Sequence, residues 1–466
     1  MTHNAKVEGN KLVDYLLKSV AERAARYLDT LDDRSVAPTP DAIDGLSRLD
    51  EAFPDQSTDA ESVISLLDEI GSPATMASAG GRFFGFVVGS SLPAALAANW
   101  LAGAWDQNAG LIVLSPIAAK LEAVAMRWLL AALHLPSNCG VGFVTCATQA
   151  NFSGLAAARH ALLARRGWDV EAQGLFGAPP ITVVVGDEVH VSVLKALSML
   201  GLGRNRVIRV PVDRQGRMRA DLLPPLDRNT IVCLQAGNVN TGAFDPADKI
   251  IPQAKQAGAW VHVDGAFGLW AAASPDRSHL MKGFADADSW ATDAHKWLNV
   301  PYDSGLAFIR EAQHLHAAMA VNAAYLVHSE TREPHQYVPD FSRRARGVEV
   351  WAALRSLGRQ GLADLIERTC RHAARFAEGL RSAGYTILND VVLNQVLVSF
   401  GDAETTRQVI AGIQEDGTCW CGGTVWQGHT AMRISVSSWA TTDEDVERSL
   451  EAMIRVAAQV REGLRL

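Results

Sequence analysis

The sequence predicts an α/β protein with a mostly parallel sheet in a large domain, a smaller α+β domain at the C-terminus and a helical N-terminal segment. Between residues 91 and 345, short apolar runs alternate with helical stretches, which is typical of β-α-β units. From residue 346, one long helical stretch precedes two strands and a closing helix. A chain of 466 residues also suits two or three domains better than one core.

Residues 1–90 are expected to form the helical segment, with joints rich in Pro and Asp such as SVAPTPDAIDG. Apolar side chains at helical spacing mark one amphipathic helix near the N-terminus: Leu12, Val13, Leu16, Leu17, Val20, Ala24, Tyr27 and Leu28. Few neighbouring residues in the sequence are available to cover this apolar face. The pattern therefore indicates a partner subunit.

Residues 91–345 are expected to form the large domain. Apolar runs predict buried strands at 181–187, 206–212, 230–237, 259–265 and 305–310. Helical patterns separate them, for example at 149–166 and 246–257. Strands that are apolar throughout and separated by helices are typical of a parallel sheet covered on both faces.

Residues 346–466 are expected to form the small domain. A long helical stretch leads to the strands VVLNQVLVSF and MRISVSS, and a helix from 442 closes the chain. Thr441 and Glu444 predict a capping box at the start of this last helix.

The composition is that of an ordinary globular protein, with 48% hydrophobic and 20% charged residues. A net charge of −8 without a basic cluster argues against nucleic-acid binding. The six cysteines are scattered, and Cys419 and Cys421 are too close for a zinc knuckle, so no metal site is expected. No signal-peptide or membrane-spanning pattern occurs, which favours a cytoplasmic protein without membrane contact.

The segment 142–166 reads as a short strand, a turn of small residues and a helix. In an open α/β sheet, ligands bind at the carboxyl ends of the strands. Free backbone N–H groups at the start of a helix favour a phosphate, with Ala147 and Thr148 as its contacts. An ordinary capped helix would show the same pattern.

Asp264 ends the predicted strand in VHVDGAFG (261–268), and small residues such as Ala266 leave room for a flat ring. A carboxylate at this place suits a protonated pyridine nitrogen. His190, which follows another predicted strand, suits stacking on a planar ring and proton exchange. A turn-capping Asp and a structural His are the alternatives.

The stretch SWATDAHKWLNVPYDSG (289–305) places Lys296 among aromatic and apolar residues, although burial of an ammonium group is costly. Condensation with an aldehyde removes that cost, which predicts a Schiff-base lysine. His295 is placed to donate to a phosphate. Arg433, in MRISVSS (432–438), has the planar fork that matches a substrate carboxylate. A surface lysine and a surface ion pair are the alternatives for the two cations.

Together and in order, these segments resemble a pyridoxal-phosphate enzyme of fold type I, and more narrowly the group II amino-acid decarboxylases. The resemblance runs from RFFGFVVGSSLPAALAANWL and SPIAAKLEAVAMRWL through HVDGAFG and DAHKWLNVPYDSG to SRRARGVEVWAALRSLGRQGL and the Arg433 strand. It covers most of the chain from about residue 80. It implies a transferase-like fold with a sheet of the seven-stranded type, and an intertwined homodimer with active sites at the interface.

The resemblance also implies roles for single residues. Lys296 would hold pyridoxal 5′-phosphate as a Schiff base, Asp264 would pair with the ring nitrogen, and His190 would stack on the ring. Ala147, Thr148 and His295 would hold the phosphate. Further matching positions are Asn238 and Asn240 in the cofactor-lining loop, Ala266 beside the ring, and Arg433 at the substrate carboxylate.

The sequence departs from this family at the loop that carries a tyrosine in the decarboxylases. The matching stretch, 326–344, is shorter, and its tyrosine is Tyr337, a candidate proton donor or a packing residue. Asp293 stands where several relatives have Asn, and Phe86 is a candidate for the substrate pocket or for the core. The predicted reaction is decarboxylation of an L-amino acid to its amine and CO2. The alternatives are an aldehyde-forming oxidative deaminase, a carbon–carbon lyase, a transaminase or a cofactor-free binding protein.

Overall fold

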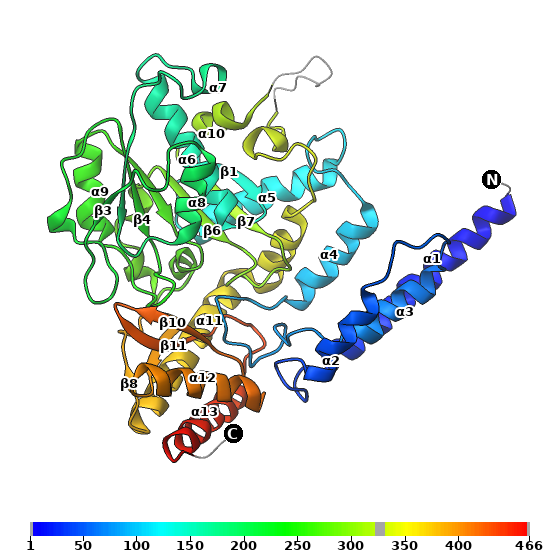
Figure 1. Cartoon of the computed structure of the whole chain (residues 1–466). Helices are drawn as coiled ribbons and strands as arrows, with labels where there is room; N and C mark the ends of the chain where they lie inside the picture. The colour runs from blue at the N-terminus through cyan, green and yellow to red at the C-terminus, as the bar shows by residue number, and fades with distance from the viewer. Residues whose placement is uncertain (1–2, 322–330, 464–466) are drawn as a thin grey trace.

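The computed structural model describes residues 3–321 and 331–463 (Figure 1). The N-terminal segment contains α1 (His3–Asp29), α2 (Pro40–Gly45) and α3 (Ala60–Gly71). Helices α1 and α3 lie side by side as an arm that stands away from the body of the chain (Figure 1). Arg23 of α1 joins them, because its guanidinium donates to Asp68 (2.9 Å) and Glu61 (3.2 Å) of α3. The predicted N-terminal helix is confirmed.

The large sheet contains seven strands in the order β1-β7-β6-β5-β4-β2-β3. Strand β7 is antiparallel to β1 and β6, and the remaining neighbours are parallel. The predicted α/β fold with a mostly parallel sheet is confirmed. The strands are β1 (Gly140–Val144), β2 (Thr182–Gly186), β3 (Ile208–Val210), β4 (Thr230–Gln235), β5 (Trp260–Asp264), β6 (Ser289–Asp293) and β7 (Gly305–Ile309).

Strand β6, SWATD, was not predicted as a strand because its sequence mixes polar and apolar residues. It is nevertheless buried along its whole length between β5 and β7. Its polar side chains therefore lie inside the protein and need partners there.

Helices cover both faces of the large sheet. One apolar core lies between the sheet and α6, α8 and α10, and the other between the sheet and α5, α9 and α11. Alternate strand residues point into the two cores, for example Val183 into one and Val184 into the other. These helices and their neighbours are α4 (Pro93–Trp105), α5 (Pro116–Ala132), α6 (Ala147–Ala164), α7 (Val170–Gln173), α8 (Val191–Met199), α9 (Ala247–Gln256) and α10 (Ala312–Met319).

The C-terminal part begins with α11 (Gly347–Ser382), which is kinked where Gly358 has φ 61°. It continues with an antiparallel sheet in the order β10-β11-β9-β8 and two helices. Since α11 packs on α4 and α5 as well as on α13, the domain boundaries at 90 and 345 stay predictions. The elements are β8 (Thr386–Ile387), β9 (Gln395–Ser399), α12 (Ala403–Asp416), β10 (Gly422–Trp426), β11 (His429–Ser435) and α13 (Asp443–Arg461).

The capping box of α13 is formed by Thr442 and Asp445, one residue later than predicted. Thr441 is not available for it, because its hydroxyl donates to the carbonyl oxygen of Gly81 (2.8 Å). The prediction of Thr441 and Glu444 was therefore wrong by one position.

Short 3-10 helices lie in the connections: η1 (Leu46–Leu49), η2 (Ala220–Leu222), η3 (Gly268–Ala273), η4 (Ser278–Met281), η5 (Phe284–Asp286) and η6 (Pro334–Tyr337). Among residues 3–321 and 331–463, none of the helices combines the length and the apolar character needed to cross a membrane.

Candidate active site

The candidate residues gather at one edge of the large sheet. Asp264 is the last residue of β5, and Lys296 lies in the turn that follows β6. Ala147 is the first residue of α6, and His190 is the N-cap of α8. Because the parallel strands end at the same edge, residues far apart in the sequence meet here.

Lys296 is only 20% exposed and is paired with a buried carboxylate. Its Nζ lies 2.9 Å from Oδ2 of Asp293, the last residue of β6. The other oxygen of Asp293 accepts the backbone N–H of Ala147 at 2.5 Å. Asp293 thus connects the candidate nucleophile to the start of α6, where the dipole favours negative charge.

The segment before α4 crosses the backbone at Lys296. A Cβ on Gly89 would lie 1.9 Å from the carbonyl oxygen of Lys296 and 2.9 Å from that of His295. Asn299 holds this crossing, since its Oδ1 accepts from the N–H of Ser90 (3.0 Å) and its carbonyl oxygen accepts from the N–H of Leu92 (2.8 Å). Only glycine fits at position 89 without displacing the lysine.

Asp264 accepts several hydrogen bonds. Its Oδ2 accepts from Asn151 Nδ2 (3.2 Å) and Ser192 Oγ (3.3 Å), and its Oδ1 accepts from the backbone N–H of Ala266 (3.2 Å). These hydrogen bonds hold the carboxylate of Asp264 in one orientation. The side chain is therefore equipped to stabilise a positive charge beside it.

The surroundings of His190 favour its neutral form. Burial lowers its pKa most, and the charges of Lys296 and Arg433 lower it further, while Asp264 opposes them. Its Nδ1 accepts from the backbone N–H of Ser192 (3.2 Å). The ring is thus fixed at the start of α8 beside the cluster of candidate residues.

His295 is buried on the other side of Lys296. Its ring stacks on Tyr302 with centroids 4.3 Å apart, and its Nδ1 accepts from the backbone N–H of Ser304 (3.1 Å). Burial lowers its pKa, and Asp293 partly offsets this. Because Nδ1 accepts, Nε2 is the atom that carries the proton and can donate to an anion.

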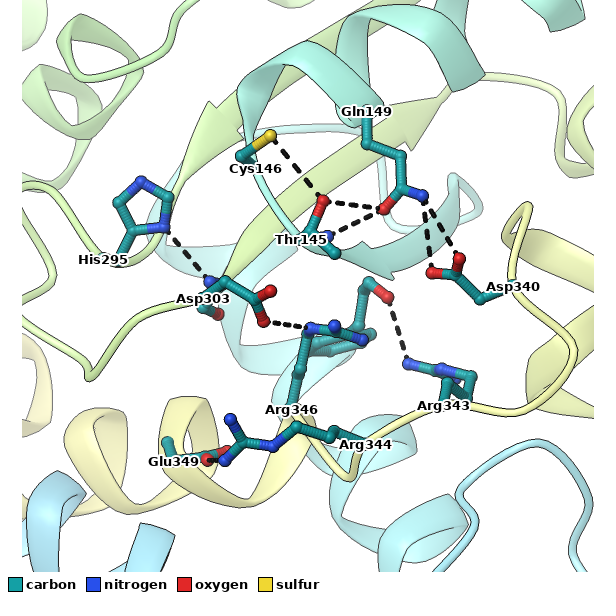
Figure 2. Close-up of polar contacts among 12 residues, drawn as sticks. Thr145, Cys146, Gln149, His295, Asp303, Asp340, Arg343, Arg344, Arg346 and Glu349 are labelled. Carbon is teal, nitrogen blue, oxygen red and sulfur yellow. Dashed lines mark hydrogen bonds and ion pairs between the residues drawn. The ribbon is translucent and has the colours of Figure 1, made fainter. Parts of the chain in front are cut away.

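A polar network supports this part of the site (Figure 2). The figure shows Asp303 between His295 and Arg346. The Nε of Arg346 donates to Asp303 Oδ1 at 2.7 Å. Gln149, one turn into α6, reaches back to the N–H of Thr145 (2.8 Å). These contacts fix the turn before α6, where Thr148 lies half-buried next to Ala147.

The loop after β4 contacts the small domain. Asn238 Oδ1 accepts from the backbone N–H of Asn240 (2.9 Å), and Asn240 Oδ1 accepts from Thr424 Oγ1 (3.1 Å). Arg433 Nη1 donates to the carbonyl oxygen of Val239 (3.1 Å), and burial lowers its pKa. The structure therefore brings Arg433 to this loop, with its remaining donors available to another acceptor.

Two predicted residues contact other groups. Tyr337 lies in η6 under the guanidinium of Arg332, 4.4 Å from the ring centroid, and packs edge-on against His316. Phe86 is 63% exposed and stacks on Trp420 with centroids 5.8 Å apart. These contacts do not join either residue to Lys296, and their roles stay predictions. Part of the predicted loop, residues 322–330, lies outside the described residues.

Sequence analysis missed Gly89, Asn151 and Ser192. Gly89 lies in GFVVGSS, where a glycine after an apolar run was a signal of close backbone approach. Asn151 lies one turn into α6, Ser192 is the second residue of α8, and neither gave a signal of its own. They reach Asp264 only because both helices start at the same sheet edge.

The site offers an amine, a carboxylate, a neutral imidazole, and a helix start beside a second imidazole. These groups match, in turn, the aldehyde, ring nitrogen, flat face and phosphate of pyridoxal 5′-phosphate. The residues present therefore fit this cofactor.

Comparison with known proteins gives the same result. Residues 44–401 match the model of the pyridoxal-dependent decarboxylase conserved domain. The aromatic-L-amino-acid decarboxylase of Bacillus atrophaeus is 26% identical over 345 residues, which cover 71% of this chain and 70% of that protein. The L-2,4-diaminobutyrate decarboxylase of Rhizobium meliloti (strain 1021) is 28% identical over 388 residues, covering 78% and 76%.

Solved structures share the fold. The crystal structure of Oryza sativa TDC with PLP and tryptamine has a TM-score of 0.87 at 22% identity, covering 97% of this chain and 98% of that chain. Mouse CSAD in apo form also has a TM-score of 0.87, at 20% identity, covering 97% and 99%. With more than half of its length matched by the family model, the chain belongs to the pyridoxal-dependent decarboxylases, carboxy-lyases that act on amino acids with pyridoxal 5′-phosphate as cofactor.

Proposed function

We propose that this protein decarboxylates an L-amino acid and that Lys296 is the residue to which the cofactor is covalently attached. The observation that carries the proposal is the pairing of Lys296 Nζ with Asp293 at the sheet edge on which Asp264, His190 and Ala147 also lie. A largely buried lysine beside a carboxylate that can take up the proton of its amine is suitably placed to attack an aldehyde. Family membership makes decarboxylation the favoured outcome over the alternatives.

When bound, the cofactor supplies an electron-withdrawing ring for the pair released as the bond from Cα to the carboxylate breaks. Asp264 would hold the charge of the ring nitrogen, supported by its donors Asn151 and Ser192. His190, kept neutral by burial, would lie against the ring without adding charge. Both residues would thus act on the ring and not on the substrate side chain.

The phosphate would be held at the start of α6 by Ala147 and Thr148, and by His295. Binding would require the N–H of Ala147, which Asp293 Oδ1 accepts in this structure, to turn to the phosphate. The proton on Nε2 of His295, set by the bond from Ser304 to Nδ1, would face the anion. Ala266 would leave room beside the ring. Asn238 and Asn240 would shape the loop that Arg433 contacts from the small domain.

Arg433 would bind a substrate carboxylate. It is half-buried, and its Nη1 donates to the loop carbonyl of Val239. A guanidinium partly withdrawn from water favours an anionic partner.

We also propose a homodimer with the active sites at the interface. Large apolar side chains are exposed on the arm, on α4 and in the segment that follows α4: Leu12, Val13, Tyr15, Leu17, Leu67, Trp100, Leu101, Trp105, Val113 and Leu114. Exposed apolar residues in such number favour a covering subunit. The molar mass of the loaded protein in solution tests this. The six cysteines are free thiols, which supports a reducing, cytoplasmic location.

The test of the function combines product analysis with one variant. The loaded protein is incubated with a panel of L-amino acids, and amine, CO2, aldehyde and ammonia are measured in parallel. Amine with stoichiometric CO2 supports decarboxylation, whereas aldehyde with ammonia contradicts it.

Lys296→Ala is expected to fold but to lose the cofactor that borohydride fixes covalently to the protein, as read by mass spectrometry. Lys195→Ala, an exposed lysine on α8, is the matched control. A fixed adduct on Lys296→Ala would exclude the lysine assignment.

A further inference from the structure

A chain of buried hydrogen bonds leads through the protein to Asp264. Trp260 Nε1 donates to Ser289 Oγ (2.9 Å), and Ser289 Oγ lies 2.8 Å from His262 Nδ1. His262 Nε2 lies 2.8 Å from Asn151 Oδ1, and Asn151 Nδ2 donates to Asp264 (3.2 Å). Each of these side chains is buried, and they come from β5, β6 and α6.

An indole donor at one end and a carboxylate acceptor at the other give this chain its direction. An indole N–H can only donate, so Ser289 Oγ accepts from Trp260, and among the described residues His262 Nδ1 is the remaining partner for the hydroxyl proton of Ser289. His262 then carries its proton on Nε2 and donates to Asn151 Oδ1. The amide of Asn151 is thereby turned so that its NH2 group faces Asp264.

His262 has the single proton that this direction requires. Burial lowers its pKa to about 4, so the ring is neutral at physiological pH. In a neutral imidazole one nitrogen donates and the other accepts. The ring of His262 therefore accepts at Nδ1 from Ser289 and donates at Nε2 to Asn151, instead of donating at both nitrogens.

The backbone is adapted to this histidine. A Cβ on Gly154 of α6 would lie 2.7 Å from Cε1 and 2.8 Å from Nδ1 of His262. The surrounding core between the sheet and α6 is otherwise apolar. Apolar side chains would fill this space at lower desolvation cost, so a fully satisfied polar chain here indicates a functional role.

The second proton of the Asn151 amide reaches a neighbouring group. It is donated to Ser192 Oγ (3.1 Å), which itself lies 3.3 Å from Asp264 Oδ2 and 2.7 Å from His190 Nδ1. One amide thus orients the side chains on both sides of the ring-binding position. This is why Asn151 is the central member of the chain.

We propose that Asn151, His262 and Ser289 are positioning residues that aim a hydrogen-bond donor at Asp264 and hold its carboxylate oriented toward the cofactor ring nitrogen. The inference rests on the proposed role of Asp264. None of the three would touch the substrate. Their effect is transmitted by Asn151 alone, the only member of the three that contacts the carboxylate in the described residues.

Other titratable groups close to Asp264 must be kept constant in any test of charge. A small cavity beside Asp264 is lined by Cys233 of β4, by Glu188 before α8 and by Asp245 after β4. His190, Lys296, Arg433 and Asp293 are further charged or titratable groups nearby. Asn151→Asp adds a titratable group beside Asp264, whereas Ser289→Ala and Trp260→Phe change none of these groups, so the two distal variants decide the test.

The test uses the loaded holoenzyme with Asn151→Asp, Ser289→Ala and Trp260→Phe. Asn151→Asp keeps the size of the side chain but replaces the donor that faces Asp264 by an acceptor. Ser289→Ala and Trp260→Phe break the chain further from the site. Ser449→Ala, a buried serine of α13, is the matched control. Cofactor dissociation constant, kcat, KM and the pH dependence of the cofactor absorption are measured, together with the unfolding midpoint.

Asn151→Asp is expected to lower kcat about tenfold or more. In the pH profiles of kcat and of cofactor absorption, the midpoint on the acid side is expected to move upward by about one pH unit. Ser289→Ala and Trp260→Phe are expected to shift both in the same direction by less. KM and the unfolding midpoint of these two variants stay near those of Ser449→Ala. A purely structural role would lower the midpoint without moving the pH limb.

The inference is overturned if Ser289→Ala and Trp260→Phe fold, bind cofactor and keep the pH limb of the parent protein. This holds even if Asn151→Asp does not fold. Asp264→Asn distinguishes a failure of the proposed role of Asp264 from a failure of the positioning role. Normal turnover in Asp264→Asn contradicts the proposed role of Asp264, whereas lost turnover with unchanged distal variants contradicts only the positioning role.

Discussion

Gly89 offers a direct test of the site geometry. The change is Gly89→Ala, which adds one methyl group where the segment before α4 crosses Lys296. The new Cβ would lie 1.9 Å from the carbonyl oxygen of Lys296, whereas ordinary contact begins at 3.4 Å. The two backbones must therefore separate by about 1.5 Å.

Neither backbone is free to move alone. The segment after Gly89 is tied to Asn299 by the N–H groups of Ser90 and Leu92. Asn299 Oδ1 also accepts from the N–H of Trp439 (2.9 Å), which anchors it to the C-terminal part of the chain. The displacement is therefore expected to pass to Lys296.

The magnitude follows from this displacement. A misplacement of about 1 Å at reacting groups costs about 100-fold in rate. Overpacking of this kind lowers the free energy of unfolding by about 1–3 kcal/mol. We expect kcat/KM for amine formation to fall about 100-fold, with the protein still folded in urea titrations.

Gly45→Ala is the matched control, because Gly45 is helical and a Cβ there meets no atom within 4 Å. It is expected to leave turnover unchanged. If Gly89→Ala retained the turnover and cofactor affinity of this control, the close crossing at Lys296 would not exist in the working enzyme. The reasoning from the geometry of Lys296 would then be refuted.

Three further predictions follow from the structure. Arg343→Met leaves the buried carboxylate of Glu122 without its 2.6 Å partner, and is expected to lower the unfolding free energy in urea by about 3–5 kcal/mol; an unchanged midpoint would contradict this. Tyr337→Phe keeps the packed ring and is expected to leave the amine product unchanged; aldehyde instead of amine would show that its hydroxyl acts in the reaction. Burial lowers the pKa of His262 to about 4 in the folded protein, whereas the unfolded chain takes up this proton at about pH 6.5. Lowering the pH from about 6.5 to about 4 therefore favours the unfolded chain and is expected to remove about 3 kcal/mol from the free energy of unfolding. This loss should be absent in His262→Gln.

Local sequence patterns were sufficient where one segment holds the whole signal. The apolar runs of β2, β4, β5 and β7 are continuous, so burial on both faces was readable directly. The polar strand β6 was missed because its burial depends on its two neighbours in the sheet. The capping box of α13 was misplaced because the hydroxyl of Thr441 is used by a distant carbonyl.

Candidate residues were found from the sequence when the chemistry was unusual for its surroundings. Lys296 lies among apolar residues, and Asp264 ends an apolar strand. Sequence order also determined that these residues follow strands and so meet at one sheet edge.

Only the tertiary structure decided which groups act on them. Asp293 pairs with Lys296, Gly89 crosses its backbone, and Asn151 turns its amide toward Asp264. Asp293 and Lys296 are only three residues apart, and their contact depends on how the turn after β6 folds. The other two relations join residues more than 100 positions apart, and the second also depends on which atom donates in a chain of hydrogen bonds. The sequence by itself predicted most of the elements, the cofactor chemistry and a candidate nucleophile. The distances and hydrogen-bond directions that tune them exist only once the helices and strands are packed, because they are properties of pairs of segments and not of any one segment.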